Sequence, residues 1–225
     1  MIQLNIPFSL LLTASLLASC GGGDSPAETP TDPMVTAPTP TPSPTPTACT
    51  AAPVSNTGYS LVFKGCNTSN VAEYFDKTEC VRDNATGLIW EGKSPSGNRA
   101  YTNVYTNFDS TSDPQKLSNG SYINPNLADI NASNNTIGYQ NSVNSANLCG
   151  LSNWRMPLRL ELQSIQAANG KVDTNWFPNT VASFYWSTSL TPALPRNQAI
   201  VVNFNSGGYG DFGRESMQSV RLVRH

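Results

Sequence analysis

Residues 149–165 read CGLSNWRMPLRLELQSI, and this stretch decides the fold. It combines a cysteine, a glycine turn, a tryptophan–arginine pair and a proline with the start of an amphipathic helix. Leu158, Leu162 and Ile165 recur at positions i, i+4 and i+7, which places them on one apolar face of a helix. Pro157 precedes them, near the position that we expect to be the first of that helix. The stretch therefore predicts a junction between a helix and the rest of the core.

The segment upstream of this junction predicts two paired strands. Residues 79–90, ECVRDNATGLIW, read as strand, turn and strand, with Gly87 free to take a positive φ in the turn. Asp83 and Thr86 lie in the same turn, and Trp90 ends the second strand.

Alternation of apolar and polar residues predicts further strands, and a more mixed pattern predicts a second helix. The strands are expected over residues 59–63, 184–187, 198–205 and 220–224, and the helix over residues 137–148. Asn169-Gly170 is expected to end the junction helix. Together these elements predict an α+β fold, in which two helices pack on a small, mostly antiparallel sheet with long loops.

Residues 93–135 are rich in Asn, Ser, Thr, Asp and Gly and show no periodicity. A loop of that length is either functional or mobile. Its carboxylates, Asp109, Asp113 and Asp129, offer the oxygen ligands that calcium prefers. Their spacing fits no EF-hand loop, so we favour a solvated loop without a cofactor and keep calcium as the alternative.

The N-terminus reads as a targeting signal. Residues 8–18 form an apolar run too short to span a bilayer, and the motif LASC ends it at Cys20. This ending matches the bacterial lipobox, in which the cysteine thiol is lipidated and becomes the new N-terminus. Residues 1–20 are thus predicted to be a lipoprotein signal peptide, with an ordinary secretory signal as the alternative. With Gly21 directly after the cysteine, the chain resembles lipoproteins sorted to the outer membrane. We therefore expect it there, with its domain facing outside or the periplasm.

The next segment, residues 21–47, has eight prolines, seven threonines and no aromatic residue. Such a composition cannot build a core, so it predicts a disordered linker with polyproline II character. Residues 48–225 then form one folded domain. It holds 13 basic and 12 acidic residues, because three of the 15 acidic residues of the chain precede it. A nearly neutral domain lacks the basic surface that nucleic-acid binding requires.

Five cysteines are present, and lipidation of Cys20 leaves four in an oxidising compartment. Four cysteines allow three pairings. We favour Cys49–Cys66, which closes a short loop, together with Cys80–Cys149, which closes a much longer one. A zinc site is the weaker interpretation, because there is no CxxC pair and the single histidine is the last residue.

The order of the motifs resembles one known family. ECVRDNATGLIWEGK is followed by LCGLSNWRMPLRLELQSI, WFPN, FYWSTS and a terminal VRLVR. Over residues 78–224 this series closely resembles the Lcl C-terminal domain, a module found at the end of a collagen-like bacterial adhesin and in many exported lipoproteins. The resemblance implies a fold similar to C-type lectins and to the formylglycine-generating enzyme. Many members carry a cysteine in the final strand, and its absence here supports Cys80 as the partner of Cys149. Leu158 stands where the family often has a capping threonine, so the junction helix is expected to start with a weaker cap.

We derive three functional hypotheses from these features. The first is a surface-displayed, lectin-like binding or adhesion module whose ligand is a glycan or a matrix polymer. The second is a structural envelope lipoprotein that binds other proteins. The third, an enzyme, is the weakest, because no residue is placed as a base for a serine or cysteine nucleophile.

The tryptophans and the loop residues lead to different expectations. Trp154 and Arg155 could contact a sugar by stacking and hydrogen bonding. We favour instead a core position for Trp154, with Arg155 paired to a carboxylate such as Asp83. Trp90 and Trp186 are also expected in the core. The residues better placed for a ligand lie in the loops: Tyr101, Tyr105, Tyr209 and Arg214.

Overall fold

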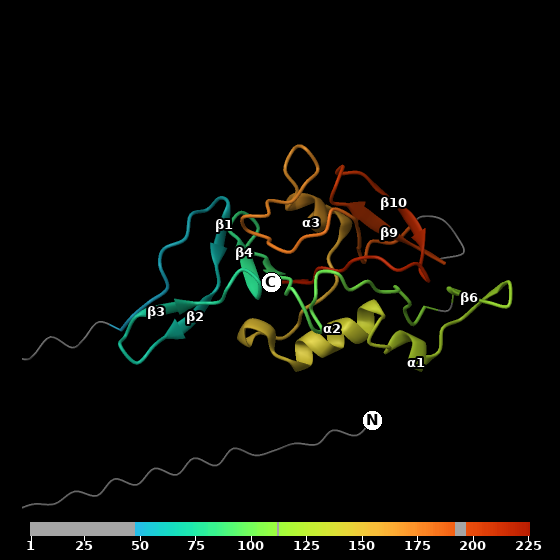
Figure 1. Ribbon diagram of the computed structural model, residues 1–225, viewed down its shortest axis with the longest axis horizontal. Helices are drawn as coiled ribbons and strands as arrows, with labels where there is room; N and C mark the ends of the chain where they lie inside the picture. Colours follow the sequence, from blue (N-terminus) through green and yellow to red (C-terminus); the bar gives the residue numbers. More distant parts are fainter. Residues whose placement is uncertain (1–47, 112, 192–196) are drawn as a thin grey trace, which may run out of the picture. The chain divides into compact units, whose positions relative to one another are not determined.

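The computed structural model describes residues 48–225 except 112 and 192–196 (Figure 1). The predictions on the signal peptide, Cys20 and the linker lie outside the described residues. Within them, no helix has the length and apolar character needed to cross a membrane.

The first sheet is antiparallel and has four strands. Their order is β1 (Tyr59–Leu61), β4 (Cys80–Asp83), β5 (Ile89–Glu91) and β11 (Val223–Arg224). The predicted strand, turn and strand at residues 79–90 are confirmed as β4 and β5. In the turn Gly87 has φ 76°, and Asp83 accepts hydrogen bonds from the Ala85 amide and the Thr86 hydroxyl. The motif residues therefore hold a structural turn.

A second antiparallel sheet and two hairpins complete the strands. The sheet has the order β10 (Tyr209–Gly213), β9 (Gln198–Asn203) and β8 (Phe184–Trp186), of which the sequence reading missed β10. One hairpin pairs β2 (Phe63–Cys66) with β3 (Ala72–Tyr74), and the other pairs β6 (Lys116–Ser118) with β7 (Ser121–Ile123). The β6–β7 hairpin projects from one end of the domain in Figure 1. It lies in the segment that was expected to be loop only.

The helices are shorter than predicted. A single turn, α1 (Leu127–Ile130), precedes α2 (Thr136–Ser145), and a 3₁₀ turn, η1 (Leu148–Gly150), follows. The junction helix is α3 (Arg159–Ser164), whose N-cap residue is Leu158. Pro157 therefore lies two residues before Arg159, the first helical residue, because Leu158 is still extended, with ψ 158°. The expected end at Asn169-Gly170 was wrong, since the helix stops at Ser164.

Two buried clusters form the core, one on each side of the strands. Cys80 belongs to the first cluster, with Trp154 and Trp186, and its neighbour Val81 belongs to the second, with Trp90. This is the period-two alternation of a strand that is buried on both faces. Helix α2 contributes to the first cluster and α3 to the second. The α+β prediction is confirmed.

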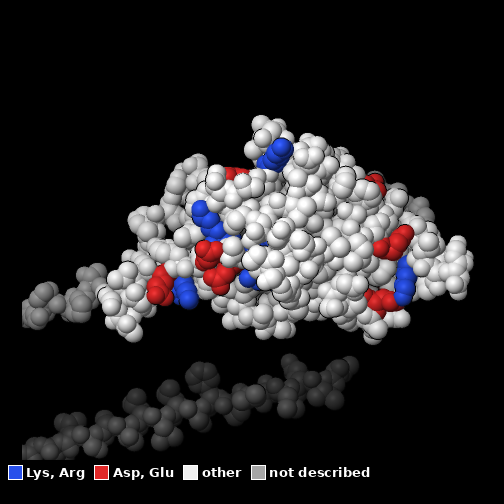
Figure 2. Space-filling view, viewed as in Figure 1, with Lys and Arg blue, Asp and Glu red and all other residues white. Residues whose placement is uncertain are grey.

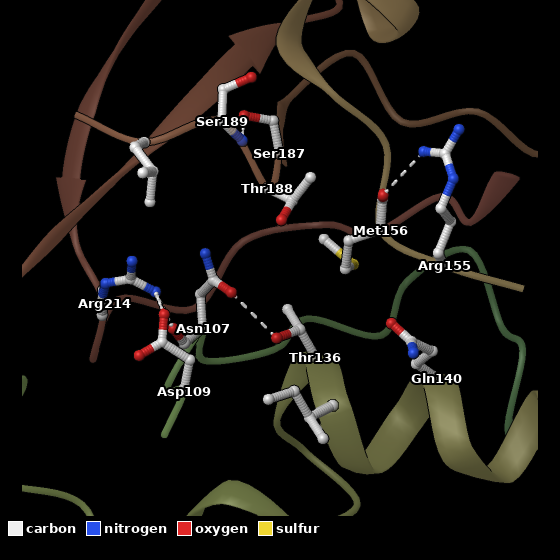
Figure 3. Close-up of a pocket in the computed structure, with 12 residues that line it drawn as sticks. Asn107, Asp109, Thr136, Gln140, Arg155, Met156, Ser187, Thr188, Ser189 and Arg214 are labelled. Carbon is white, nitrogen blue, oxygen red and sulfur yellow. Dashed lines mark hydrogen bonds and ion pairs between the residues drawn. The ribbon is translucent and has the colours of Figure 1, made fainter. Parts of the chain in front are cut away.

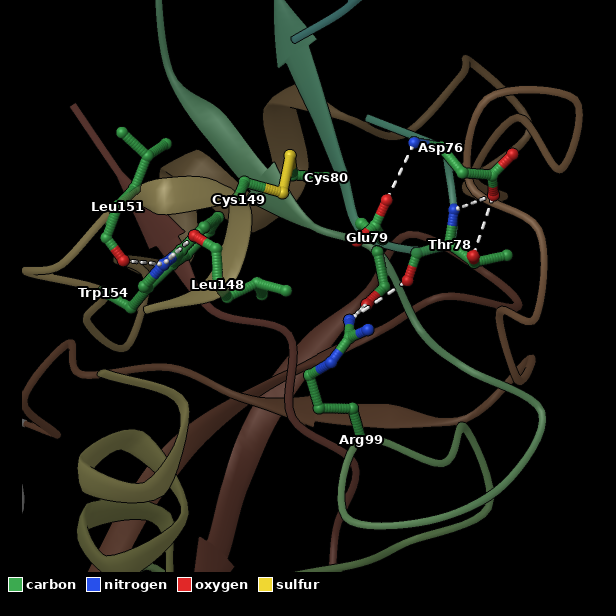
Figure 4. The surroundings of a disulfide bond; sticks show 10 residues. Asp76, Thr78, Glu79, Cys80, Arg99, Leu148, Cys149, Leu151 and Trp154 are labelled. Atoms are coloured by element: carbon green, nitrogen blue, oxygen red, sulfur yellow. Dashed lines mark hydrogen bonds between the residues drawn. A yellow bond between two sulfur atoms is a disulfide. The ribbon is translucent and has the colours of Figure 1, made fainter. Parts of the chain in front are cut away.

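Two disulfides stabilise the domain, with the pairing that was predicted. The N-terminal disulfide joins Cys49 to Cys66, which is exposed, and the core disulfide joins Cys80 to Cys149, both buried. The core disulfide connects strand β4 to η1, at the start of the stretch on which the fold depends (Figure 4).

Candidate functional site

Trp154 fills the space beside the core disulfide (Figure 4). It is 1% exposed, and its indole N–H donates to the carbonyls of Leu148 and Leu151. The side chain of Asn144, on α2, holds the backbone of Trp154 by accepting from its amide and donating to its carbonyl. Trp90 and Trp186 are each 0% exposed. The expectation that all three tryptophans are core residues is confirmed.

Arg155 forms an ion pair at the start of α3. Its guanidinium binds both carboxylate oxygens of Glu161, at 2.7 and 2.8 Å. The expected carboxylate partner for Arg155 is confirmed, but it is Glu161 and not Asp83, which accepts hydrogen bonds within its own turn. The hydrogen bonds from Arg155 lower the pKa of Glu161. Glu161 also accepts from the Leu158 amide, and the Ser189 hydroxyl accepts from the Arg159 amide, so two of the amides at the helix start are satisfied without a capping threonine.

The three loop tyrosines lie in different environments. Tyr105 is 2% exposed, its ring packs at a tilt against that of Tyr139 with centroids 4.5 Å apart, and its backbone carbonyl accepts from the Trp186 indole. Its prediction as a ligand residue is therefore corrected to a core residue. Tyr101 is half-buried, while Tyr209 is 57% exposed and lies under the guanidinium of Arg159, at 4.2 Å. The structure does not bring these tyrosines together into one site.

Arg214 is buried and paired with Asp109 at 2.9 Å. The other oxygen of Asp109 accepts from the amide and hydroxyl of Thr111 and from the Gln115 side chain. Partial burial raises the pKa of Asp109, but these hydrogen bonds and Arg214 outweigh it, so that the pKa is lowered. Asp129 forms a separate ion pair with Lys116. Among the described residues no three side chains of the His, Cys, Asp or Glu type cluster in a way that could hold a metal ion.

A polar cleft opens beside this ion pair (Figure 3). Its volume is about 260 Å³. Five separate parts of the chain form its walls: residues 107–109, the first turns of α2, residues 155–156, residues 187–190 after β8, and Arg214 after β10. Of the four loop residues expected to bind a ligand, only Arg214 lines it.

Hydrogen-bonding groups converge on the cleft from opposite walls. The Thr136 hydroxyl donates to the Asn107 side-chain oxygen at 3.0 Å, which turns the Asn107 amide nitrogen toward the cleft (Figure 3). Gln140 and Thr188 line it as well, and their side chains make no hydrogen bond to any part of the chain that the structure describes. Ile137, Met156 and Leu190 supply the apolar wall. Small ligands are typically held by such a set, in which a few polar groups converge within an apolar frame.

Sequence reading missed most of this cleft. Asn107, Thr136 and Gln140 are ordinary residues of a polar, Asn- and Thr-rich region, and no local pattern distinguishes them. Residues 187–190 follow a predicted strand, which was the only local signal. The site is formed by contacts between distant segments, and a single sequence does not show such contacts.

A second group of buried charges lies in the core, away from this cleft. Glu91 and Lys93 pair at 3.0 Å, and the Tyr139 hydroxyl donates to the Glu91 carboxylate while its oxygen accepts from the Lys93 ammonium at 2.9 Å. Burial lowers the pKa of Lys93 to about 8, although Glu91 opposes the shift. The Glu91 carboxylate also accepts from the Leu222 amide, and the backbone carbonyl of Glu91 accepts from the Arg221 guanidinium. This network holds β5 to the C-terminal segment and is structural.

Charge is sparse on the surface. Figure 2 shows scattered basic and acidic side chains on one face, several of them adjacent to each other. No large basic region is visible on that face.

The comparison with protein families matches residues 79–224 to the Lcl C-terminal domain. The match covers more than half of the 225 residues. The chain belongs to this family. In the Lcl C-terminal domain of this chain, the turn between β4 and β5 is built by Asp83, Thr86 and Gly87. The junction before α3 is built around Trp154. No curated protein is similar enough in sequence to count as a relative.

Proposed function

We propose that this chain is a lipid-anchored envelope lipoprotein whose Lcl C-terminal domain is a non-catalytic binding module, with its ligand held in the polar cleft. The observation that carries the proposal is the cleft itself, where uncommitted amide and hydroxyl groups converge on a space of about 260 Å³. Hydroxyl-rich ligands such as glycans match these groups, so the ligand is a glycan or a matrix polymer.

The composition of the cleft supports binding rather than catalysis. Among the described residues that line it, Asp109 is the only one with a carboxylate, and Arg214 and Thr111 hold that carboxylate. The hydroxyls of Ser187 and Ser189 are engaged by backbone groups, and no lining residue is a histidine or a cysteine that would activate them. A general base is therefore missing from the set that lines the cleft.

The sequence supports the cellular placement. The lipobox at Cys20 would anchor the chain in the envelope, and Gly21 favours the outer membrane. Residues 21–47 would then tether the domain at a distance from the lipid, of at most roughly 80 Å at about 3.1 Å per residue. The domain would face outside or the periplasm.

A second candidate function, protein binding, has one observation in its favour. The β6–β7 hairpin and α1 expose Leu117, Tyr122, Ile123 and Leu127, with exposed fractions between 42% and 74%. Leu117 and Tyr122 are paired across the hairpin, and exposed apolar groups that are neighbours in this way are typical of protein contacts. An envelope protein would then bind the hairpin, and the cleft would have no role.

One binding experiment separates these candidates. The full-length protein, in a detergent without a sugar headgroup, is applied to a glycan array with and without calcium. Two variants accompany it: Leu190→Trp, which places a bulky ring in the cleft, and Leu117→Ser, which removes an apolar group from the hairpin. We expect glycan binding that Leu190→Trp abolishes and Leu117→Ser retains. An array without any bound glycan, or binding that only Leu117→Ser removes, would refute the proposal.

A further inference from the structure

We infer that the cleft recognises a single neutral, hydroxyl-rich ring, of the size of one hexose, by direct hydrogen bonds and without a metal ion. The inference rests on the proposed function and goes beyond it by naming the charge, the size and the binding mode of the ligand.

The size of the cleft suits one ring. Its volume of about 260 Å³ lies just below the roughly 300–1,000 Å³ of pockets that hold drug-sized molecules. At about 30 Å³ for each water molecule, it corresponds to about nine waters. A hexose ring with its hydroxyl groups needs a space of this order, whereas the rest of a polymer would remain outside.

The charges around the cleft favour a neutral ligand. Arg214 is compensated by Asp109, and Arg155 by the bidentate contact with Glu161. A sulfate or a carboxylate would have to compete with these partners for each guanidinium. The Arg214 side chain is only 5% exposed, so separating it from Asp109 would leave a buried charge without its partner. An anionic sugar is therefore expected to bind no better than a neutral one.

The hydrogen bonds of the empty cleft suit a hydroxyl group. The Thr136 hydroxyl donates its hydrogen bond to the side-chain oxygen of Asn107. The lone pairs of the Thr136 oxygen can therefore accept a hydrogen bond from a ligand, and the side-chain NH₂ of Asn107 can donate one. A sugar hydroxyl both donates and accepts, so it can satisfy both residues together. Gln140, one turn after Thr136 on α2, and Thr188, in the segment after β8, add further donors and acceptors to the lining.

Arg214 acts as a positioning residue for this contact. The Arg214 guanidinium donates to the backbone carbonyl of Asn107 at 2.8 Å, and the backbone carbonyl of Arg214 accepts from the backbone amide of Asn107. These two bonds fix the backbone that carries the Asn107 side chain.

The carboxylate of the cleft is not available for calcium. Both oxygens of Asp109 already accept from N–H or O–H donors, namely Thr111, Gln115 and Arg214. Calcium needs six to eight oxygen ligands, and no second carboxylate lines this cleft in the part of the chain that the structure describes. Recognition must therefore come from the amide and hydroxyl groups.

The test is calorimetric titration of the full-length protein, in a detergent without a sugar headgroup, with glucose, galactose, mannose and N-acetylglucosamine. Each titration is done in calcium and in EDTA, and glucuronate and a sulfated hexose serve as charged probes. We expect at least one neutral sugar to bind with a millimolar Kd that calcium leaves unchanged within twofold. Leu190→Trp, at an exposed position of the cleft wall, should weaken binding at least tenfold.

The matched control is Leu160→Trp, which adds the same ring at an exposed residue of α3 that does not line the cleft. It should leave the Kd unchanged. Gln140→Ala, a milder change, should weaken binding severalfold. The inference is refuted by dependence on calcium, by a charged sugar that binds more than tenfold tighter, or by equal Kd values for both tryptophan variants. If the array shows polymer binding through the cleft but no single sugar binds, the proposed function stands and this inference fails.

Discussion

Replacing Trp154 by alanine tests whether residues 149–165 hold the fold together. The side chain is 1% exposed and packs in the cluster around the core disulfide. Truncating a buried tryptophan leaves a cavity and typically costs about 3–5 kcal/mol. Domains of this size are stable by only about 5–15 kcal/mol, so the variant should lose a large share of its stability.

A second substitution separates packing from hydrogen bonding. Trp154→Phe keeps most of the buried ring but loses the indole N–H, which donates to the carbonyls of Leu148 and Leu151. Leaving these partners without the donor should cost about 1–3 kcal/mol. Most of the loss in Trp154→Ala would then be due to packing.

The assay is denaturant unfolding followed by fluorescence and circular dichroism, with Trp176→Ala as the control. Trp176 is only partly buried, beside Lys77, so the same truncation there should cost much less. A loss below about 1 kcal/mol for Trp154→Ala, or a loss no larger than that of Trp176→Ala, would refute the role assigned to this residue.

Three further predictions concern the disulfides and the ion pairs. Replacing the two cysteines of the core disulfide by serines should lower the free energy of unfolding by about 4 kcal/mol, because this disulfide closes a loop of 69 residues. The same replacement at the N-terminal disulfide should cost about 3 kcal/mol, because that loop has 17 residues. A denaturant titration that gives the reverse order would contradict this. The pKa of Glu161 is lowered by Arg155 in the folded state, so the pair stabilises above the unfolded pKa and this contribution is lost as the pH falls through the folded pKa. Glu161→Gln should therefore destabilise at pH 7 and approach the wild type under acid, as thermal unfolding at both pH values would show; a pH-independent difference would argue against the pair. Burial lowers the pKa of Lys93 to about 8, so the unfolded chain binds more protons above that pH and stability should rise between about pH 8 and 10. Lys93→Met should flatten this rise in urea titrations, and an unchanged slope would contradict it.

Local patterns were sufficient for the elements that depend on neighbouring residues. Asp83, Thr86 and Gly87 form a turn through contacts within a few residues, and the strands on either side alternate as strands do. The buried tryptophans could be predicted because large apolar side chains at strand ends and junctions are usually enclosed.

The errors at the helix boundaries have identifiable physical causes. The junction helix begins after Leu158 because Ser189, from a distant segment, accepts from the first helical amide. The β6–β7 hairpin turns at Asn119-Gly120, both with positive φ, and this dipeptide was a hairpin signal that was overlooked within a polar region. Tertiary contacts decide the first case, and turn chemistry that was available in the sequence decides the second.

The cleft could not have been predicted from the sequence. Its hydrogen-bonding groups are drawn from segments between residues 107 and 214, which become neighbours only when the sheets pack. Arg214 was identified as a residue for a ligand, but its role in fixing Asn107 depends on a contact across 107 positions.

The central claim is that the ligand binds in this cleft. The most direct test follows the side-chain amide signals of Asn107 and Gln140 in ¹H–¹⁵N spectra while a glycan from the array is added to the labelled protein. The account predicts that both signals shift in a saturable way, while the backbone amides of β6 and β7 stay in place. Shifts confined to the β6–β7 hairpin, with the two cleft amides unchanged at saturation, would contradict it.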